Sequence, residues 1–240
     1  MGSKRFPGKC MHKIGKFPLV CYTYVQSVLT GYVSMVVTPD EEIQDELLNN
    51  RRIPCLLTSN RPINGSERCA EALANEIFNT MGNKDIIIDV QGDMVKFDHT
   101  AINELVSLLS SEKVEFATVF SSLPDSSYTN PNRVKCSIKY DDKLKTLLVD
   151  DFSRNPIPNR ENYLHVGIYG FTKESLNRYY QWSPSKNELT IRLEQMRIVD
   201  NNFPIGGVMT TEIPIAIDCL ADVCLAEKEI KGDFECSMFI

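Results

Sequence analysis

The sequence has no long apolar run, little histidine and no cysteine spacing of the kind that holds a metal. No stretch approaches the roughly 18 apolar residues that a membrane-spanning helix needs, and the amino terminus is polar and basic, unlike a secretory signal. The three histidines and eight cysteines include no CxxC pair, which argues against a structural zinc site. We therefore expect a cytoplasmic protein with reduced cysteines and no membrane insertion.

Positive charge is also scarce, because 26 Lys and Arg stand against 32 Asp and Glu, for a net charge of −6. The cations are scattered along the chain, which argues against nucleic acid as a partner. Hydrophobic content of 42% and charged content of 24% are ordinary for a globular protein. At 240 residues the chain is long enough for one domain with a substantial core, so we expect a single domain over residues 1–240.

Short β-branched runs alternate with segments of helical periodicity. The runs that predict strands cover residues 33–37, 55–58, 85–90, 116–120 and 213–217. The segments that predict helices cover residues 41–48, 70–78, 100–109, 173–181 and 189–199. This alternation is typical of an α/β fold with a mostly parallel sheet. Residues 132–160 differ, because two β-like stretches flank Asp141 and Asp142 and predict a hairpin, or ribbon, added to the main sheet.

The first candidate site is the basic loop SKRFPGK, residues 3–9. Three cations within six residues, on a loop shaped by Gly and Pro, can wrap a triphosphate with backbone N–H groups and side-chain charge. A solvated basic terminus is the simpler interpretation of this composition alone. A second candidate is the segment NGSER, in which Ser66 has the right type to cap a helix whose N–H groups favour anions or ring carbonyls. An ordinary capped helix explains it equally simply.

Two aspartates follow predicted strands. Asp93 ends the segment VQGD after residues 85–90, and Asp218 follows residues 213–217. Ligands of open α/β sheets gather beyond the carboxyl ends of strands, where two such carboxylates can share Mg²⁺. An Asp in a turn that bonds to its own backbone is the alternative. Spacing in the sequence does not show that Asp93 and Asp218 meet.

Taken in order, these segments resemble the 3-deoxy-manno-octulosonate cytidylyltransferase (CMP-Kdo synthetase) family. The resemblance runs from residue 3 to about residue 227 and rests on seven segments: SKRFPGK (3–9), NGSERCAEA (64–72), VQGD (90–93), FSRNPIP (152–158), LHVGIYGF (164–171), LEQMR (193–197) and AIDCLADV (216–223). It implies a Rossmann-like, glycosyltransferase-A-like nucleotidyltransferase fold, and a homodimer with residues 132–160 as the dimerisation arm. It also implies transfer of CMP from CTP to the anomeric hydroxyl of Kdo, for lipopolysaccharide or a related glycan.

The resemblance also implies roles for single residues. The nucleotide would be bound by Ser3, Arg5, Lys9, Gly65, Ser66 and Arg68. The sugar acid would be bound by Gln91, Ser153, Arg154, His165, Tyr169, Glu194 and Gln195. Asp93 and Asp218 would hold Mg²⁺ and, with Lys9, form the catalytic set. His165 would be a hydrogen-bonding wall of the pocket rather than a general base, and no Ser or Cys nucleophile is needed.

The sequence departs from the family in places. The family has an apolar strand ending in P-A-R upstream of the basic loop, whereas this sequence starts at Met1 where that strand has just ended. Met94 replaces Glu-Pro after VQGD, and Cys219 to Ala221 replace T-P-E. Two alternatives therefore stay open: a cytidylyltransferase for another sugar acid, such as amino-Kdo or a nonulosonate, and a truncated, impaired paralogue without activity.

Overall fold

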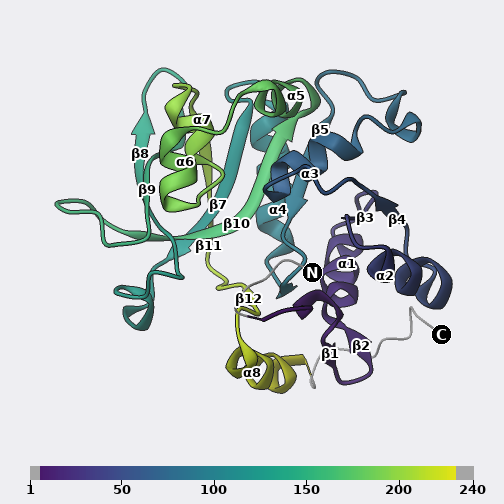
Figure 1. Ribbon diagram of the computed structural model, residues 1–240. Helices are drawn as coiled ribbons and strands as arrows, with labels where there is room; N and C mark the ends of the chain where they lie inside the picture. The colour runs from purple at the N-terminus through teal and green to yellow at the C-terminus, as the bar shows by residue number, and fades with distance from the viewer. Residues whose placement is uncertain (1–5, 231–240) are drawn as a thin grey trace. The chain divides into compact units, whose positions relative to one another are not determined.

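The computed structural model describes residues 6–230, and the chain divides into two compact units. Unit 1 contains Met1–Arg61, Val90–His99 and Pro214–Ile240, and unit 2 contains Pro62–Asp89 and Thr100–Ile213. The chain passes repeatedly from one unit to the other, so the units are not consecutive domains (Figure 1). Within residues 6–230, no helix combines the length and apolar character needed to cross a bilayer.

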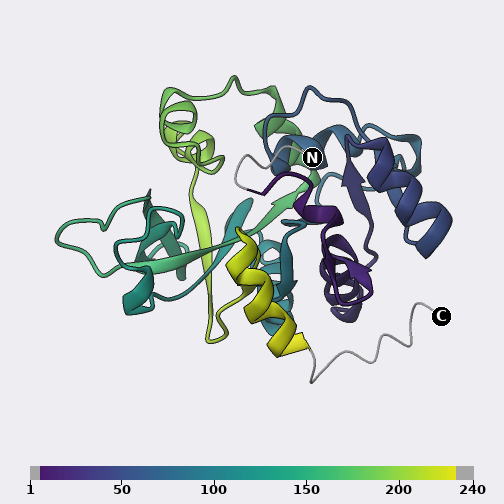
Figure 2. The same cartoon turned by 60° about the horizontal axis from the view of Figure 1, so that its bottom comes forward.

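Unit 2 is organised around a mixed six-stranded sheet. Its strands follow the spatial order β5 (Ile86–Val90), β10 (Tyr163–Thr172), β7 (Phe116–Ser122), β11 (Ile205–Thr210), β9 (Thr146–Ser153) and β8 (Lys135–Asp141). β11 is parallel to β7, whereas β10 is antiparallel to β7, and β9 is antiparallel to both β11 and β8. The hairpin β8–β9 lies at the end of the sheet opposite β5 (Figures 1 and 2).

Helices cover both faces of this sheet. The helices of unit 2 are α3 (Gly65–Ala72), α4 (His99–Ser110), α5 (Lys173–Gln181), α6 (Lys186–Ile191) and α7 (Met196–Asp200), with 3-10 turns at Glu76–Phe78 and Asp125–Ser127. On one face α4 comes very close, because a Cβ at Gly170 would lie 2.7 Å from Leu109 Cδ1. On the other face Leu176 of α5 and Met196 of α7 join Phe116 in the main core.

Unit 1 is made of smaller pieces around helix α1 (Leu19–Leu29), which is apolar on most sides. Its strands form three short pairs: β1 (Lys13–Ile14) with β2 (Phe17–Pro18), β3 (Val36–Thr38) with β4 (Cys55–Leu57), and β6 (Met94–Lys96) with β12 (Ile215–Ala216). Its other helices are the 3-10 turn η1 (Lys9–Met11), α2 (Glu41–Asp45), the π-helix η2 (Glu46–Asn50) and α8 (Leu220–Ile230). Two apolar clusters, one around Leu19 and one around Leu47, form its core.

The α/β class, the mixed sheet and the hairpin are confirmed, but the expectation of a mostly parallel sheet is wrong. The reason is that β8 and β9 are joined by a tight hairpin, whose strands are antiparallel, and that β10 runs antiparallel to both β7 and β8. The predicted helix over residues 189–199 is also wrong, because the chain breaks at Arg192, whose φ of 56° ends α6. The helix predicted over 70–78 ends earlier, at Ala72. Strands β10 and β11 and helix α1 were not predicted.

Candidate functional site

In unit 1, a lysine ammonium lies between two carboxylates. Lys9 Nζ contacts the carboxylate of Asp93, lies 3.9 Å from Asp218 Oδ1, and donates a hydrogen bond of 3.2 Å to the carbonyl of Ile217. The Lys9 and Asp93 side chains are about 15% and 14% exposed, and that of Asp218 is 33% exposed. The arrangement brings together the three residues predicted as the catalytic set.

The pairing of two very short strands explains why the aspartates meet. Asp93 immediately precedes β6 and Asp218 closely follows β12, and the two strands are antiparallel. The start of one strand therefore lies beside the end of the other, and Ile217 N–H donates to the Asp93 carbonyl at 3.0 Å. From the sequence, a shared site was suggested only at the carboxyl ends of strands in one large sheet, whereas antiparallel pairing of the short strands β6 and β12 brings the two aspartates together.

The loop before Lys9 is held by a tight turn. Gly8 has φ 70°, a backbone conformation that favours glycine, and Lys9 N–H donates to the Phe6 carbonyl. The turn places Lys9 at the start of η1. The predicted residues Ser3 and Arg5 lie outside the described residues. Gln91 belongs to the neighbouring turn, where its carbonyl accepts a hydrogen bond from Met94 N–H.

Asp218 is positioned through its backbone. The carboxylate of Asp222 accepts hydrogen bonds of 2.8 Å from the N–H groups of Asp218 and Cys219, at the start of α8. This fixes the chain on the carboxyl side of Asp218. Within residues 6–230, no cluster of three or more His, Cys, Asp and Glu has the arrangement of a metal site. A carboxylate pair that shares one cation nevertheless fits Mg²⁺, which takes one or two carboxylates and completes its coordination with phosphate and water.

In unit 2, the first turn of α3 is capped by Asn64 and not, as predicted, by Ser66. The Asn64 side chain accepts from Glu67 N–H at 2.8 Å, because Asn64 precedes the first helical residue while Ser66 is already inside the helix. Ser66 is buried, and its N–H donates to Glu194 Oε2 at 3.0 Å. A carboxylate of the chain therefore occupies the N-terminus of α3, where anions are favoured.

Gly65 lies very close to a side chain of β5. A Cβ at this position would lie 2.9 Å from Asp89 Oδ2, so any larger residue would push the Asp89 carboxyl out of its place. Arg68, three residues further, donates to the Pro62 carbonyl at 3.4 Å.

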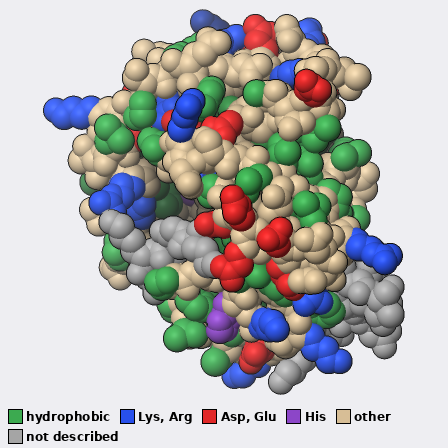
Figure 3. Space-filling model, turned by 45° about the vertical axis from the view of Figure 1, so that its right-hand side comes forward, with side chains coloured by type: hydrophobic (Ala, Val, Ile, Leu, Met, Phe, Trp, Pro, Cys, Tyr) green, Lys and Arg blue, Asp and Glu red, His purple; other side chains and the backbone are tan. Residues whose placement is uncertain are grey.

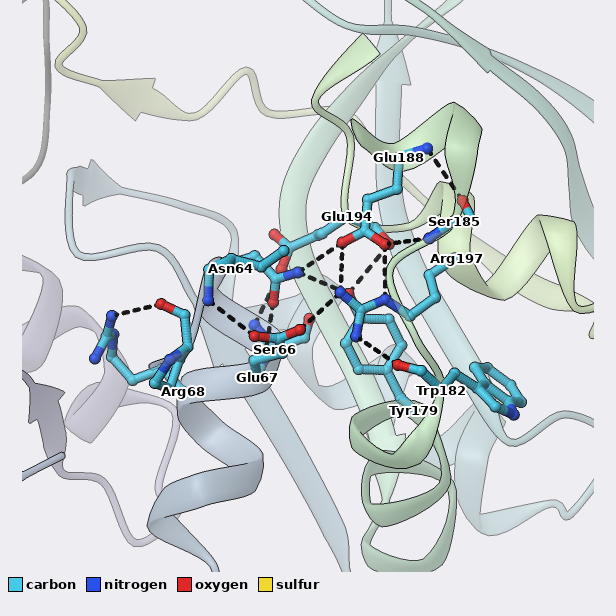
Figure 4. Close-up of polar contacts among 12 residues, drawn as sticks. Asn64, Ser66, Glu67, Arg68, Tyr179, Trp182, Ser185, Glu188, Glu194 and Arg197 are labelled. Carbon is cyan, nitrogen blue, oxygen red and sulfur yellow. Dashed lines mark hydrogen bonds and ion pairs between the residues drawn. The ribbon is translucent and has the colours of Figure 1, made fainter. Parts of the chain in front are cut away.

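A buried charge network joins α3 to α6 and α7 (Figure 4). Arg197 has no exposed surface and pairs with Glu188 through two hydrogen bonds of 2.7 Å and with Glu67 at 2.7 Å. The Tyr179 ring lies 4.4 Å from the Arg197 guanidinium carbon, and Asn64 donates to both Tyr179 and Glu188. Sequence reasoning assigned no role to Arg197 or Glu188, since an arginine and a glutamate on different segments give no sign that they are buried together.

His165 and Tyr169 lie together on β10, with ring centroids 5.4 Å apart. His165 Nε2 lies 3.0 Å from Thr118 Oγ1. The Thr118 hydroxyl donates its proton to the Ile168 carbonyl at 2.7 Å, so its oxygen accepts a hydrogen bond from the His165 ring N–H. Burial lowers the pKa of His165 to about 3, which keeps the ring neutral. The neutral ring is a hydrogen-bonding group and not a proton acceptor at physiological pH.

Gln195 carries a buried donor without a partner. Tyr169 donates to Gln195 Oε1 at 3.1 Å, while Gln195 Nε2 has no hydrogen-bond partner among the described residues. The side chain is only 2% exposed, and an unmet buried donor is costly unless a ligand or water completes it.

The Arg154 guanidinium donates hydrogen bonds to backbone carbonyls. It donates to the carbonyls of Ile191 and Arg192, at 2.7 and 2.8 Å, and to that of Pro131 at 3.2 Å. Arg154 therefore holds the turn that ends α6, where orphan carbonyls accumulate. Ser153, at the end of β9, accepts from Asn155 N–H at 3.0 Å.

The predicted site residues thus fall into two sets, one in each unit. Unit 1 contains Lys9, Gln91, Asp93 and Asp218, and unit 2 contains Gly65, Ser66, Arg68, Ser153, Arg154, His165, Tyr169, Glu194 and Gln195. The surface agrees with the scattered positions of Lys and Arg along the sequence. On the face drawn in Figure 3, these side chains are dispersed rather than gathered in one basic patch.

Comparison with known proteins gives a consistent result. A family model described as cytidylyltransferase matches residues 1–209. A 3-deoxy-manno-octulosonate cytidylyltransferase of Chlamydia caviae is 32% identical over 237 residues, covering 95% of this chain and 89% of the relative. A protein of the same name from Leptospira biflexa is 30% identical over 240 residues, covering 95% and 92%. Among solved structures, a CMP:2-keto-3-deoxy-manno-octonic acid synthetase complexed with CTP shares the fold, with a TM-score of 0.82 at 21% identity, covering 97% of this chain and 95% of the other.

Proposed function

Because this chain belongs to the cytidylyltransferase family, we propose that it transfers CMP from CTP to the anomeric hydroxyl of Kdo, giving CMP-Kdo and pyrophosphate. The names of the relatives, at 30% and 32% identity over nearly the whole chain, support the substrates. The observation that carries the chemistry is the convergence of Asp93 and Asp218 on the Lys9 ammonium.

The reaction needs charge neutralisation more than covalent help. The sugar hydroxyl attacks the α-phosphorus of CTP in line, and pyrophosphate leaves. Lys9 and Arg5 bind the phosphates and offset the charge that develops on the leaving group. Asp93 and Asp218 would hold Mg²⁺, which when bound neutralises the triphosphate and acidifies the attacking hydroxyl.

The sugar acid is bound mainly through hydrogen bonds, from neutral groups and from the carboxylate of Glu194. Gln195 offers an unmet donor, and the neutral imidazole of His165 accompanies the hydroxyl of Tyr169 on β10. Burial raises the pKa of Tyr169, so its hydroxyl keeps its proton. Glu194 supplies an acceptor for sugar hydroxyls, and Ser153 and Gln91 complete the proposed set. For Arg154, holding the turn at Ile191 is the better-supported role within this proposal.

The cytidine part is assigned to the segment around α3. Gly65, Ser66 and Arg68 are proposed to contact it, although Ser66 N–H is already bonded to Glu194. A contact from Ser66 would therefore use its hydroxyl or its carbonyl.

We also propose a homodimer that uses the hairpin β8–β9 as its arm. Light scattering that returns a 27.2 kDa monomer at micromolar concentration would contradict the homodimer.

The described cysteines are all free thiols, which supports a reducing compartment such as the cytoplasm.

The proposal is tested by a panel of acceptors. Purified protein is given CTP and Mg²⁺ with Kdo, amino-Kdo or a nonulosonate, and pyrophosphate release is followed. We expect turnover with Kdo to exceed that with the other acids. Asp142→Asn is the matched control for aspartate substitutions, because this side chain is 90% exposed in the turn of the hairpin. A folded protein that releases no pyrophosphate with any acceptor would favour the inactive paralogue.

A further inference from the structure

Asp89 is a buried carboxyl group to which the proposed chemistry assigns no role. It lies on β5, is only 6% exposed, and its Oδ2 has no hydrogen-bond partner among the described residues. Gly65 of α3 approaches this oxygen so closely that a Cβ there would lie 2.9 Å from it. An ionised carboxylate with an unmet oxygen in such a place is costly, because the buried oxygen has no donor among the described residues to stabilise its charge.

A second carboxyl group, that of the half-buried Glu194, lies at the same turn of α3. Glu194 Oε2 accepts from the N–H of Ser66, the residue that follows Gly65. Consecutive residues of one helical turn thus contact the two carboxyl groups. Two negative charges confined together in a low-dielectric interior repel each other, so one of the two groups takes a proton.

Hydrogen bonding decides which group takes the proton. Burial raises the pKa of both carboxyls, and Glu194 adds to the effect on Asp89, raising the pKa of Asp89 to about 7. The Ser66 N–H opposes the rise in the pKa of Glu194, and a hydrogen bond with Cys69 opposes the rise at Asp89, but Asp89 Oδ2 has no donor among the described residues. The other titratable and charged groups that act on this pair or on its immediate neighbours are Arg68 and Cys69 of α3, Tyr169 of β10, Tyr179 of α5, and Glu188 of α6. None of these five supplies a hydrogen bond to Asp89 Oδ2, so a proton on Asp89 itself resolves the unmet oxygen.

We propose that Asp89 is a positioning residue that, in its protonated form, donates a hydrogen bond to Glu194 and fixes that carboxylate at the first turn of α3. The pair then carries one negative charge and not two. This inference rests on the proposed function, in which Glu194 accepts from hydroxyls of the sugar acid. Loss of the Asp89 proton places a second negative charge beside the binding site of an anionic substrate, and so weakens its binding.

The test compares the wild type with Asp89→Asn across pH. Asparagine keeps the shape and an N–H donor but does not ionise. With an Asp89 pKa of about 7, we expect the wild-type KM for Kdo to rise about tenfold between pH 6 and pH 8, with kcat changed much less. The KM of Asp89→Asn should stay nearly constant over that range, and Asp89→Leu, which lacks the donor, should have a raised KM at every pH. An Asp89→Asn variant whose KM follows the wild-type pH dependence overturns the proposal.

A second measurement needs no substrate and separates this inference from the proposed function. The folded-state pKa of Asp89 is raised above its unfolded value, so wild-type stability falls as pH rises toward 7 and the loss is complete above it. We expect the melting temperature of the wild type to fall between pH 5 and pH 8 relative to Asp89→Asn, while Asp142→Asn follows the wild type. If the wild type lacks activity with Kdo, the proposed function fails, and this melting difference still decides the role of Asp89. Parallel curves for the wild type and Asp89→Asn, or an Asp89→Asn chain that fails to fold, overturn the inference.

Discussion

The two units handle negative charge in opposite ways. In unit 1, Asp93 and Asp218 are partly exposed and are balanced by the end of one flexible lysine side chain. In unit 2, Glu67 and Glu188 are buried and are held by the planar guanidinium of Arg197, which also stacks on Tyr179. A lysine is a compact charge that moves readily between partners, whereas a buried bidentate arginine fixes geometry. The Lys9–Asp93–Asp218 site of unit 1 is therefore suited to exchange of the lysine for another cation. The network of Arg197, Glu67 and Glu188 in unit 2 is suited to holding α3, α6 and α7 rigidly together.

The largest effect is expected from removing the buried ion pairs of Arg197 with Glu67 and Glu188. Arg197→Met leaves the Glu67 and Glu188 carboxylates buried without their counter-charge, and should lower the free energy of unfolding by about 3–5 kcal/mol. Urea denaturation measures this difference. The control is Lys84→Met, which removes the exposed pair with Glu112 and should cost less than about 1 kcal/mol. Equal costs for the two substitutions would remove the contrast between the units.

The second largest effect is expected at the Lys9–Asp93–Asp218 site of unit 1, where removal of a carboxylate should lower activity. Asp93→Asn or Asp218→Asn removes a hard anionic ligand and should lower kcat by about a hundredfold or more while the protein stays folded. Steady-state kinetics at saturating Mg²⁺, with circular dichroism as the check on folding, measures it. A variant that keeps more than about a tenth of wild-type activity has lost only about 1.4 kcal/mol of transition-state stabilisation, too little for an essential ligand.

Lys9→Gln tests the same site of unit 1 by removing its positive charge and keeping both carboxylates. Without the ammonium, the two carboxylates lose the positive charge that lies between them, so we expect divalent cations to bind the nucleotide-free protein several-fold more tightly. The KM for CTP should rise in the same variant, because a phosphate-binding charge is gone. Mn²⁺ titration followed by electron paramagnetic resonance measures the first effect. Weaker Mn²⁺ binding in Lys9→Gln would show that the lysine supports the cation site and does not compete with it.

The smallest effect is expected at the start of α8. Asp222→Ala removes the acceptor that holds the N–H groups of Asp218 and Cys219, and should cost about 1 kcal/mol of stability. It should also raise the Mg²⁺ concentration needed for half-maximal activity, because the backbone of Asp218 is no longer fixed. Asp222→Asn keeps an acceptor oxygen and should recover most of both losses. If alanine and asparagine behave alike, this carboxylate does not position Asp218.

Local chemistry explains which elements could be predicted from the sequence. α5 matches its predicted bounds because its periodicity is regular and Thr172 and Ser175 form a capping box. The hairpin β8–β9 follows from the polar turn at Asp141, which separates two β-like runs. The glycosyltransferase-A likeness and the dimerisation arm stay predictions.

The remaining features depend on contacts between distant segments. β12 lies within the run 213–217 that predicted a strand, but β6 is too short to stand out, and only the pairing of the two brings Asp93 to Asp218. The burial of Arg197 and the unmet oxygen of Asp89 arise only when segments more than a hundred residues apart, or different layers of one unit, come together. Hydrophobic periodicity gives no information about such pairings.

The central claim, transfer of CMP to Kdo, is tested most directly by identifying the product. Purified protein is incubated with CTP, Kdo and Mg²⁺, and the products are separated by anion exchange and assigned by ³¹P NMR and mass spectrometry. We expect a CMP-Kdo phosphodiester and pyrophosphate in equal amounts, formed by the wild type and by Asp142→Asn but not by Asp93→Asn. Unconsumed CTP with folded wild-type protein, or pyrophosphate release that does not depend on Kdo, would contradict it.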